Sequence, residues 1–170
     1  YWIEGEGDPV VLIHGLAVSI ESWENNIRHI AETHKVVAFD IPGFGLSSRL
    51  SNKDFYSFDN AYRFLHRVIE TICGFDVPVT LVGNSMGGLV ALRFALAYPN
   101  LVSKLALVDS AGLGKEIFAP IRMQTIWPIG ELLLHPNNAT VRLIAKVLIH
   151  RHDLITEEFV SSMARYSEIT

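Results

Sequence analysis

The segment Gly83-Asn84-Ser85-Met86-Gly87 places a serine between two glycines, each two residues away. An apolar run at residues 79–82 precedes it, and a helix-like run at residues 87–98 follows it. In so sharp a strand-to-helix turn the backbone passes close to itself at Gly83 and Gly87, where there is no Cβ to clash. The pattern therefore predicts that Ser85 is presented above a sheet edge as a nucleophile. The alternative is a glycine-rich turn that serves packing alone.

A nucleophile of this kind attacks a carbonyl carbon, so the site must stabilise the negative charge that develops on oxygen. The helix that begins after Ser85 would point free N–H groups and the positive end of its dipole at this oxygen. Two other turns carry motifs of their own. They are His14-Gly15-Leu16 after a first apolar run, and Asp40-Ile41-Pro42-Gly43-Phe44-Gly45-Leu46-Ser47 after a second.

These three motifs together resemble those of the α/β-hydrolase superfamily. The resemblance implies that the oxyanion is held by the backbone N–H groups of Leu16 and Met86. It also implies that His14 and Asp40 shape their loops and take no part in the chemistry.

The same resemblance implies an acid and then a histidine, both later in the chain than the nucleophile. Asp109, at the end of the apolar run 105–108, is the candidate acid, although most of the family uses the next strand. His14 precedes the elbow, and the other six histidines lie on or beside predicted helices or in residues 113–170: His29, His34, His66, His135, His150 and His152. We therefore expect the catalytic histidine to lie outside these 170 residues.

Serine as the nucleophile disfavours haloalkane dehalogenases and epoxide hydrolases, which resemble this chain but attack with aspartate. The expected function is hydrolysis of an ester or related acyl compound, with a small, largely apolar substrate and no metal or organic cofactor. The elbow also resembles that of ring-cleavage C–C hydrolases, but Leu16-Ala17-Val18-Ser19 stands where those enzymes have a glycine-rich extension. A non-catalytic binding module or an inactive fragment is the alternative from another class.

The elements that must position these residues alternate along the chain. Apolar runs at residues 10–13, 36–39, 79–82 and 105–108 predict strands, and helical spacing at 20–32, 57–73 and 87–98 predicts helices between them. This order predicts an α/β fold with a mostly parallel sheet and helices on both faces. Residues 1–112 form the N-terminal part of the hydrolase core, and we find no candidates for the last two core strands.

Residues 113–170 contain no convincing strand, and prolines at 120, 128 and 136 separate helical segments. We interpret this region as a helical cap, with its clearest helices at residues 140–151 and 157–167. Thr156 is placed to cap the second of these helices.

The composition excludes several classes of protein. With 14 basic and 18 acidic residues and a net charge of −4, the chain lacks the basic surface of a nucleic-acid binder. One cysteine, Cys73, allows neither an internal disulfide nor a cysteine-based metal site. The most apolar stretch, residues 79–98, contains Asn84 and Arg93 and is not expected to span a membrane. No targeting signal is visible, so the default expectation is a cytoplasmic protein, and the sequence does not indicate an oligomeric state.

Overall fold

The computed structural model describes residues 1–16, 18–52, 56–114 and 137–168. The chain divides into two compact units, residues Tyr1–Gly114 and Lys115–Thr170, which are described separately.

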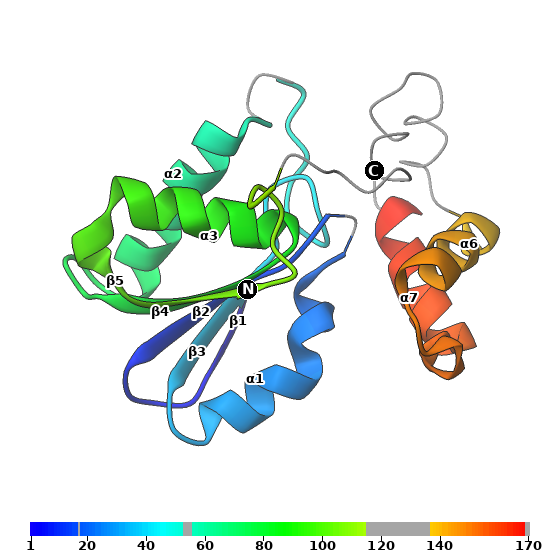
Figure 1. Ribbon diagram of the computed structural model, residues 1–170, viewed down its shortest axis with the longest axis horizontal. Helices are drawn as coiled ribbons and strands as arrows, with labels where there is room; N and C mark the ends of the chain where they lie inside the picture. The colour runs from blue at the N-terminus through cyan, green and yellow to red at the C-terminus, as the bar shows by residue number, and fades with distance from the viewer. Residues whose placement is uncertain (17, 53–55, 115–136, 169–170) are drawn as a thin grey trace. The chain divides into compact units, whose positions relative to one another are not determined.

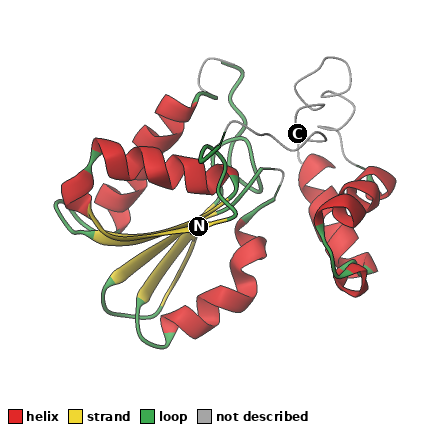
Figure 2. Ribbon diagram, viewed as in Figure 1, coloured by secondary structure: helices red, strands yellow, loops and turns green. Residues whose placement is uncertain are grey.

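The first unit is built on a five-stranded sheet (Figure 2). Its strands are β1 (Trp2–Glu4), β2 (Pro9–Ile13), β3 (Lys35–Phe39), β4 (Val79–Asn84) and β5 (Val102–Val108), in the order β1-β3-β2-β4-β5. Strands β3, β2, β4 and β5 run parallel to one another, and β1 pairs antiparallel with β3. The predicted fold class, α/β with a mostly parallel sheet, is confirmed.

Helices cover both faces of this sheet (Figure 1). Helices α2 (Phe58–Ile72) and α3 (Met86–Ala97) lie on one face, and the 3-10 turn η1 (Ile20–Trp23) with α1 (Glu24–Ala31) lies on the other. Alternate residues of β2 enter the two cores: Val11 and Ile13 pack with α2 and α3, while Val10 and Leu12 pack with η1 and α1. All five residues of β2 are therefore buried, as expected for a central parallel strand.

Three details differ from the sequence expectation. Strand β1 was not predicted, because three residues are too short to show a period. The predicted helix 20–32 begins as a 3-10 turn, with the Ser19 hydroxyl accepting from the Glu21 N–H. Strand β4 runs on to Asn84, so the strand ends directly at the serine.

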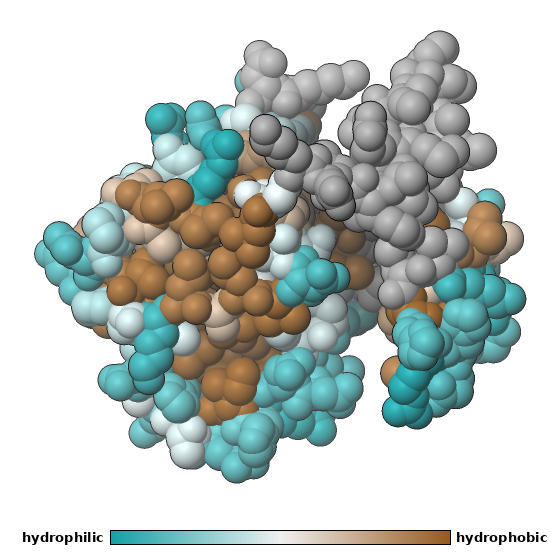
Figure 3. All heavy atoms as spheres, viewed as in Figure 1, coloured by the Kyte–Doolittle hydropathy of each residue, from teal (hydrophilic) through white to brown (hydrophobic). Residues whose placement is uncertain are grey.

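Strand β5 is the edge of the sheet within the described residues. None of its residues is fully buried, and Val108 is 44% exposed. Figure 3 shows apolar residues gathered on one face of the first unit. An exposed strand edge favours association, because its outward backbone groups have no strand partner among the described residues.

The second unit contains α6 (Asn138–Leu148), the 3-10 turn η4 (His152–Leu154) and α7 (Glu157–Glu168). Asn137 and Thr140 form a reciprocal capping box at the start of α6, and the Thr156 hydroxyl accepts from the Phe159 N–H at the start of α7. A small apolar core joins the two helices: Val141, Ala145, Ile155, Val160 and Ala164. Both helices form close to the predicted positions, but α6 begins at Asn138 and ends at Leu148, where the sequence predicted a helix over residues 140–151, because the backbone turns extended at Ile149. The three prolines of the expected cap lie outside the described residues. The function of this unit as a cap stays a prediction.

Candidate active site

Ser85 lies at the junction of β4 and α3 with a left-handed backbone, φ 51° and ψ −115°. A non-glycine residue in such a conformation carries a strain of about 1–3 kcal/mol and needs surrounding structure to hold it there. This is the geometry expected from the G-x-S-x-G pattern in its strand-to-helix context.

Both peptide groups of Ser85 are held by hydrogen bonds. Its N–H donates to the Val108 carbonyl at 3.0 Å, which ties it to the end of β5. Its carbonyl accepts from the Gly88 N–H at 3.1 Å and from the Ala111 N–H at 3.0 Å. The strained residue is thus held from β5 and the following turn as well as from its own helix.

The two glycines of the elbow are required by close backbone approach. A Cβ added to Gly83 would lie 2.4 Å from the Gly87 carbonyl oxygen. A Cβ added to Gly87 would lie 2.3 Å from the Ile13 carbonyl oxygen. Both distances are far below a van der Waals contact, so a side chain at either position would force the turn apart.

The loop after β2 reaches the elbow at Gly15. A Cβ placed on Gly15 would lie 3.3 Å from Ser85 Cβ and 3.0 Å from Asn84 Oδ1. Leu16 is the next residue along this loop, and Met86 is the first residue of α3, whose N–H has no acceptor within the helix. The structure brings the two loops together, and the predicted roles of Leu16 and Met86 as oxyanion donors stay predictions.

His14 is fully buried and holds this loop in place. The Ile41 N–H donates to His14 Nε2 at 3.0 Å, so Nε2 carries no proton and Nδ1–H donates to the Gly15 carbonyl at 2.8 Å. Burial lowers the pKa of His14, although the Gly15 carbonyl and the Asp40 carboxylate act in the opposite direction. His14 is therefore a neutral residue with both ring nitrogens in use, which agrees with the structural role implied by the resemblance.

Asp40 joins the loops that follow β2 and β3. Its side chain is nearly buried, and its two carboxylate oxygens accept from the Ile20 and Leu46 N–H groups, each at 2.9 Å. Gly45 has φ +51°, and a Cβ there would lie 2.2 Å from Asp40 Cγ. The D-x-P-G-x-G-x-S motif thus folds its loop around the carboxylate, as expected for a residue that shapes the loop.

Asp109, the candidate acid, directly follows β5 and also has a positive φ, 46°. It is exposed, and its carboxylate makes no hydrogen bond or ion pair to any described residue. The structure places it one residue beyond Val108, whose carbonyl accepts from the Ser85 N–H, and pairs it with none of the described histidines.

Most of the other described histidines have contacts away from Ser85, and His150 is exposed and contacts no described residue through a hydrogen bond or ion pair. His29 lies beside Glu32, His34 beside Thr33, and the His66 ring stacks on Tyr98 with centroids 4.3 Å apart. His152 Nε2 lies 3.0 Å from the Lys146 carbonyl, and His135 is outside the described residues. Within the described part of the chain, no hydrogen bond joins Ser85 to a histidine.

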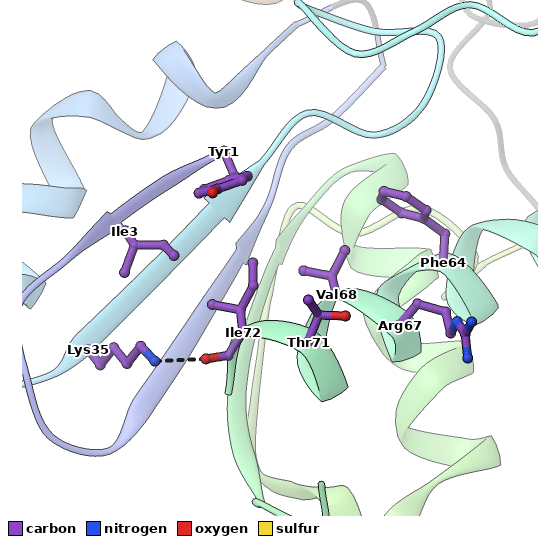
Figure 4. Close-up of a pocket in the computed structure, with 8 residues that line it drawn as sticks. All are labelled: Tyr1, Ile3, Lys35, Phe64, Arg67, Val68, Thr71 and Ile72. Atoms are coloured by element: carbon purple, nitrogen blue, oxygen red, sulfur yellow. Dashed lines mark hydrogen bonds between the residues drawn. The ribbon is translucent and has the colours of Figure 1, made fainter. Parts of the chain in front are cut away.

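An open groove of about 540 Å³ lies elsewhere, along edge strand β1 and helix α2 (Figure 4). Its lining is mostly apolar, and Lys35 Nζ at its rim donates to the Ile72 carbonyl at 2.8 Å. None of its lining residues comes from the loops around Ser85: Tyr1, Ile3, Lys35, Phe64, Arg67, Val68, Thr71 and Ile72. This groove is not the candidate active site.

Sequence reasoning missed two contacts at the elbow. Asn84 Nδ2 donates to the Val108 carbonyl at 3.1 Å, the same oxygen that accepts from the Ser85 N–H. A Cβ on Gly88 would lie 2.4 Å from Ser110 Oγ, so the turn after β5 packs directly on the first turn of α3. The second glycine of Gly87-Gly88 was the available signal for this close contact.

The structure also bears on metal binding and on membrane spanning. Among the described residues, no group of three or more His, Cys, Asp or Glu side chains is arranged to hold a metal ion. No helix in the same part of the chain has the length and apolar character needed to cross a membrane.

The fold and the elbow geometry agree with a comparison against protein families. The model of the alpha/beta hydrolase fold family matches residues 8–129, which is more than half of the chain. The protein therefore belongs to the α/β-hydrolase family.

The names of individual relatives are more specific than the description of the family. The chain is 33% identical over 160 residues to a 2-hydroxy-6-oxo-6-phenylhexa-2,4-dienoate hydrolase of Burkholderia cepacia, covering 92% of this chain and 55% of the relative. It is 39% identical over 125 residues to a 2-hydroxy-6-oxo-6-(2'-aminophenyl)hexa-2,4-dienoic acid hydrolase of Metapseudomonas resinovorans, covering 72% and 42%. A meta-cleavage product hydrolase from Pseudomonas fluorescens IP01 superposes with a TM-score of 0.83 at 25% identity, covering 98% of this chain and 59% of that one. The chain thus spans about half the length of the curated relatives it matches.

Proposed function

We propose that this protein is a serine hydrolase in which Ser85 Oγ attacks a carbonyl carbon of a small, largely apolar molecule. The observation that carries the proposal is the left-handed backbone of Ser85 between β4 and α3, with the Gly15 loop packed against it. A serine strained at such a turn is typical of a nucleophile in this family.

The proposed first step forms a bond from Ser85 Oγ to the carbonyl carbon, while the hydroxyl proton passes to a base and the carbonyl π electrons move to oxygen. The N–H groups of Leu16 and Met86 stabilise this oxyanion. When the carbonyl re-forms, the leaving group departs with the bonding electron pair and takes up a proton. Water then hydrolyses the acyl group from Ser85.

The base in this proposal is a histidine outside residues 1–170. The lone pair of His14 Nε2 is already used by the Ile41 N–H, so His14 cannot take the Ser85 proton without losing that bond. Asp109 is the candidate for the acid that orients the histidine, because it follows the strand whose end binds Ser85.

We propose C–C bond hydrolysis of the ring-cleavage type as the reaction. Support comes from the relatives, two of which carry the names of hydrolases of 2-hydroxy-6-oxo-dienoates. The chemistry is compatible with the same site, because a carbon leaving group next to a conjugated carbonyl system can hold the electron pair by delocalisation until it is protonated. Attack, oxyanion stabilisation and acyl transfer are otherwise unchanged.

Ester hydrolysis is the second candidate. It is favoured by the loop after His14-Gly15, where Leu16 is 37% exposed and no glycine-rich extension follows. A bulky apolar residue at this point suits an uncharged acyl group.

The test compares both substrate classes on the full-length protein. We expect the protein to cleave 2-hydroxy-6-oxo-6-phenylhexa-2,4-dienoate, and the loss of the visible absorbance of this substrate measures the reaction. Hydrolysis of p-nitrophenyl esters should be slower. Ser85→Ala should lower kcat by about 10³-fold or more. Ser103→Ala, the same substitution at an exposed position of β5, is the matched control and should leave kcat unchanged.

The outcomes separate the alternatives. Hydrolysis of esters alone selects the second candidate. A wild-type protein that cleaves neither substrate, or a Ser85→Ala variant as active as the wild type, overturns the proposal and favours a non-catalytic binding module.

A further inference from the structure

The turn at residues 109–112 packs against the first turn of helix α3 at two points. Ser110 lies over Gly88, where an added Cβ would meet Ser110 Oγ at 2.4 Å and Ser110 Cβ at 2.7 Å. Gly112, with φ +85°, lies against Leu89, whose Cδ1 would be 2.5 Å from a Cβ on Gly112. The turn thus rests on two consecutive residues of the helix.

These two helix residues also bind the Ser85 carbonyl. The N–H groups of Gly88 and Leu89 lie 3.1 and 3.3 Å from this oxygen, and the Ala111 N–H, from the middle of the turn, lies 3.0 Å away. Ser110 and Gly112 flank Ala111, so their packing against the helix determines how closely the Ala111 N–H approaches the Ser85 carbonyl. Ser110 Oγ donates to the Ala111 carbonyl at 2.9 Å, which fixes the turn internally.

The other peptide group of Ser85 is bound from the residue just before this turn. Its N–H donates to the Val108 carbonyl, so residues 108–111 bind the nucleophile on both sides of its Cα. A residue with φ 51° and ψ −115° keeps that conformation only while its surroundings over-determine it. Residues 108–111 provide the backbone hydrogen bonds to Ser85 that come from outside α3.

We propose that the turn at residues 109–112 is a positioning element for Ser85, and that the contact of Ser110 with Gly88 sets its place. The inference rests on the proposed role of Ser85 as nucleophile. Ser110 and Gly88 do not touch the reacting atoms; they act through the backbone of Ser85.

The test is a rescue experiment on the full-length protein. Gly88→Ala should push the turn away and slow the reaction of Ser85 with a fluorophosphonate probe on the order of tenfold or more, because misplacement of a reacting group by about 1 Å can cost about 100-fold. Ser110→Gly alone removes the side chain that packs on Gly88 and the hydrogen bond to the Ala111 carbonyl, so it should slow labelling, but by a smaller factor than Gly88→Ala does. The double variant Gly88→Ala/Ser110→Gly should label faster than Gly88→Ala and recover to about the rate of Ser110→Gly, since the next nearest atom to the added Cβ, Gly83 O at 3.1 Å, needs only a small shift.

A matched control separates positioning from stability. Gly74 follows α2 and has φ +109°, and its added Cβ would meet Val77 Cγ2 at 3.2 Å, so Gly74→Ala strains the fold at a site that has no contact with the elbow. This variant should melt at a lower temperature yet label at the wild-type rate below its transition. Gly88→Ala should label slowly even where circular dichroism shows it to be folded.

Amide hydrogen exchange at Ala111 supplies a readout that does not depend on chemistry. We expect slow exchange in the wild type, faster exchange in Gly88→Ala and recovery in the double variant. If the wild type is not labelled at Ser85, the proposed function fails, and exchange at Ala111 still tests whether the turn holds the serine. A double variant that remains as slow to label and as fast to exchange as Gly88→Ala overturns the inference.

Discussion

Replacement of His14 by leucine tests whether the loop before Leu16 is held as the structure indicates. The side chain is fully buried, and its ring bonds two buried backbone groups, the Ile41 N–H and the Gly15 carbonyl. Leucine fills a similar volume but leaves both groups without a partner. Each orphaned buried group costs about 1–3 kcal/mol, so His14→Leu should lower the free energy of unfolding by about 2–6 kcal/mol.

Urea unfolding followed by circular dichroism measures this loss. His14→Gln is the informative second variant, because its Oε1 can stand near the position of Nε2 and accept from the Ile41 N–H. It should therefore lose less stability than His14→Leu. His29→Leu, at a side chain that is 83% exposed, is the matched control and should change stability by less than about 0.5 kcal/mol.

His14→Leu should also change how the free energy of unfolding depends on pH. Because burial lowers the pKa of His14 in the folded protein, the unfolded chain binds more protons once the pH falls below the ordinary histidine pKa of about 6.5. The stability that neutral His14 contributes is present above this pH and is lost as the pH falls toward the folded-state value. His14→Leu should flatten this part of the profile and His29→Leu should not. Equal stability of His14→Leu and wild type at pH 7, or an unchanged slope below pH 6.5, would refute the reasoning.

Two further predictions concern the buried carboxylate of Asp40 and the partly buried thiol of Cys73. Asp40→Asn turns one carboxylate acceptor into an amide donor that faces either the Ile20 or the Leu46 N–H. The free energy of unfolding should therefore fall by about 1–3 kcal/mol, and a urea midpoint equal to that of the wild type would contradict this. Burial raises the pKa of the Cys73 thiol, although Lys35 acts in the opposite direction. Iodoacetamide should therefore alkylate Cys73 at pH 8 more slowly than it alkylates a free cysteine. Equal rates of alkylation, measured by mass spectrometry, would contradict this.

The sheet could be predicted from the sequence because its central strands are continuous apolar runs. Residues 10–13 and 36–39 are buried on both faces, and such runs have few other interpretations between helical segments. Strand β1 could not be found in the same way. Its three residues acquire their structure from pairing with β3, about 34 residues later, and only Trp2 packs into a core.

The elbow could be predicted because its glycines and its strand-to-helix context are local. The partners of His14 and Asp40 could not be predicted, since the Ile41 N–H is 27 residues from His14 and the Ile20 N–H is 20 residues from Asp40. A hydrogen bond across such a separation depends on how the loops after β2 and β3 meet. The resemblance supplied the structural role of both residues, and the structure supplies the atoms that perform it.

The strained backbone of Ser85 depends both on the local motif and on residues far away in the sequence. The G-x-S-x-G pattern removes the side chains that would block the turn, but it provides no bond that keeps the serine in a left-handed conformation. Part of that constraint comes from Val108 and Ala111, which are more than 20 residues later in the sequence. A protein could therefore keep the complete motif and lose the nucleophile geometry through a change in the turn after β5. This is why the motif alone is weaker evidence than the motif on a folded sheet, and why Ser110 and Gly88 are the residues at which to test it.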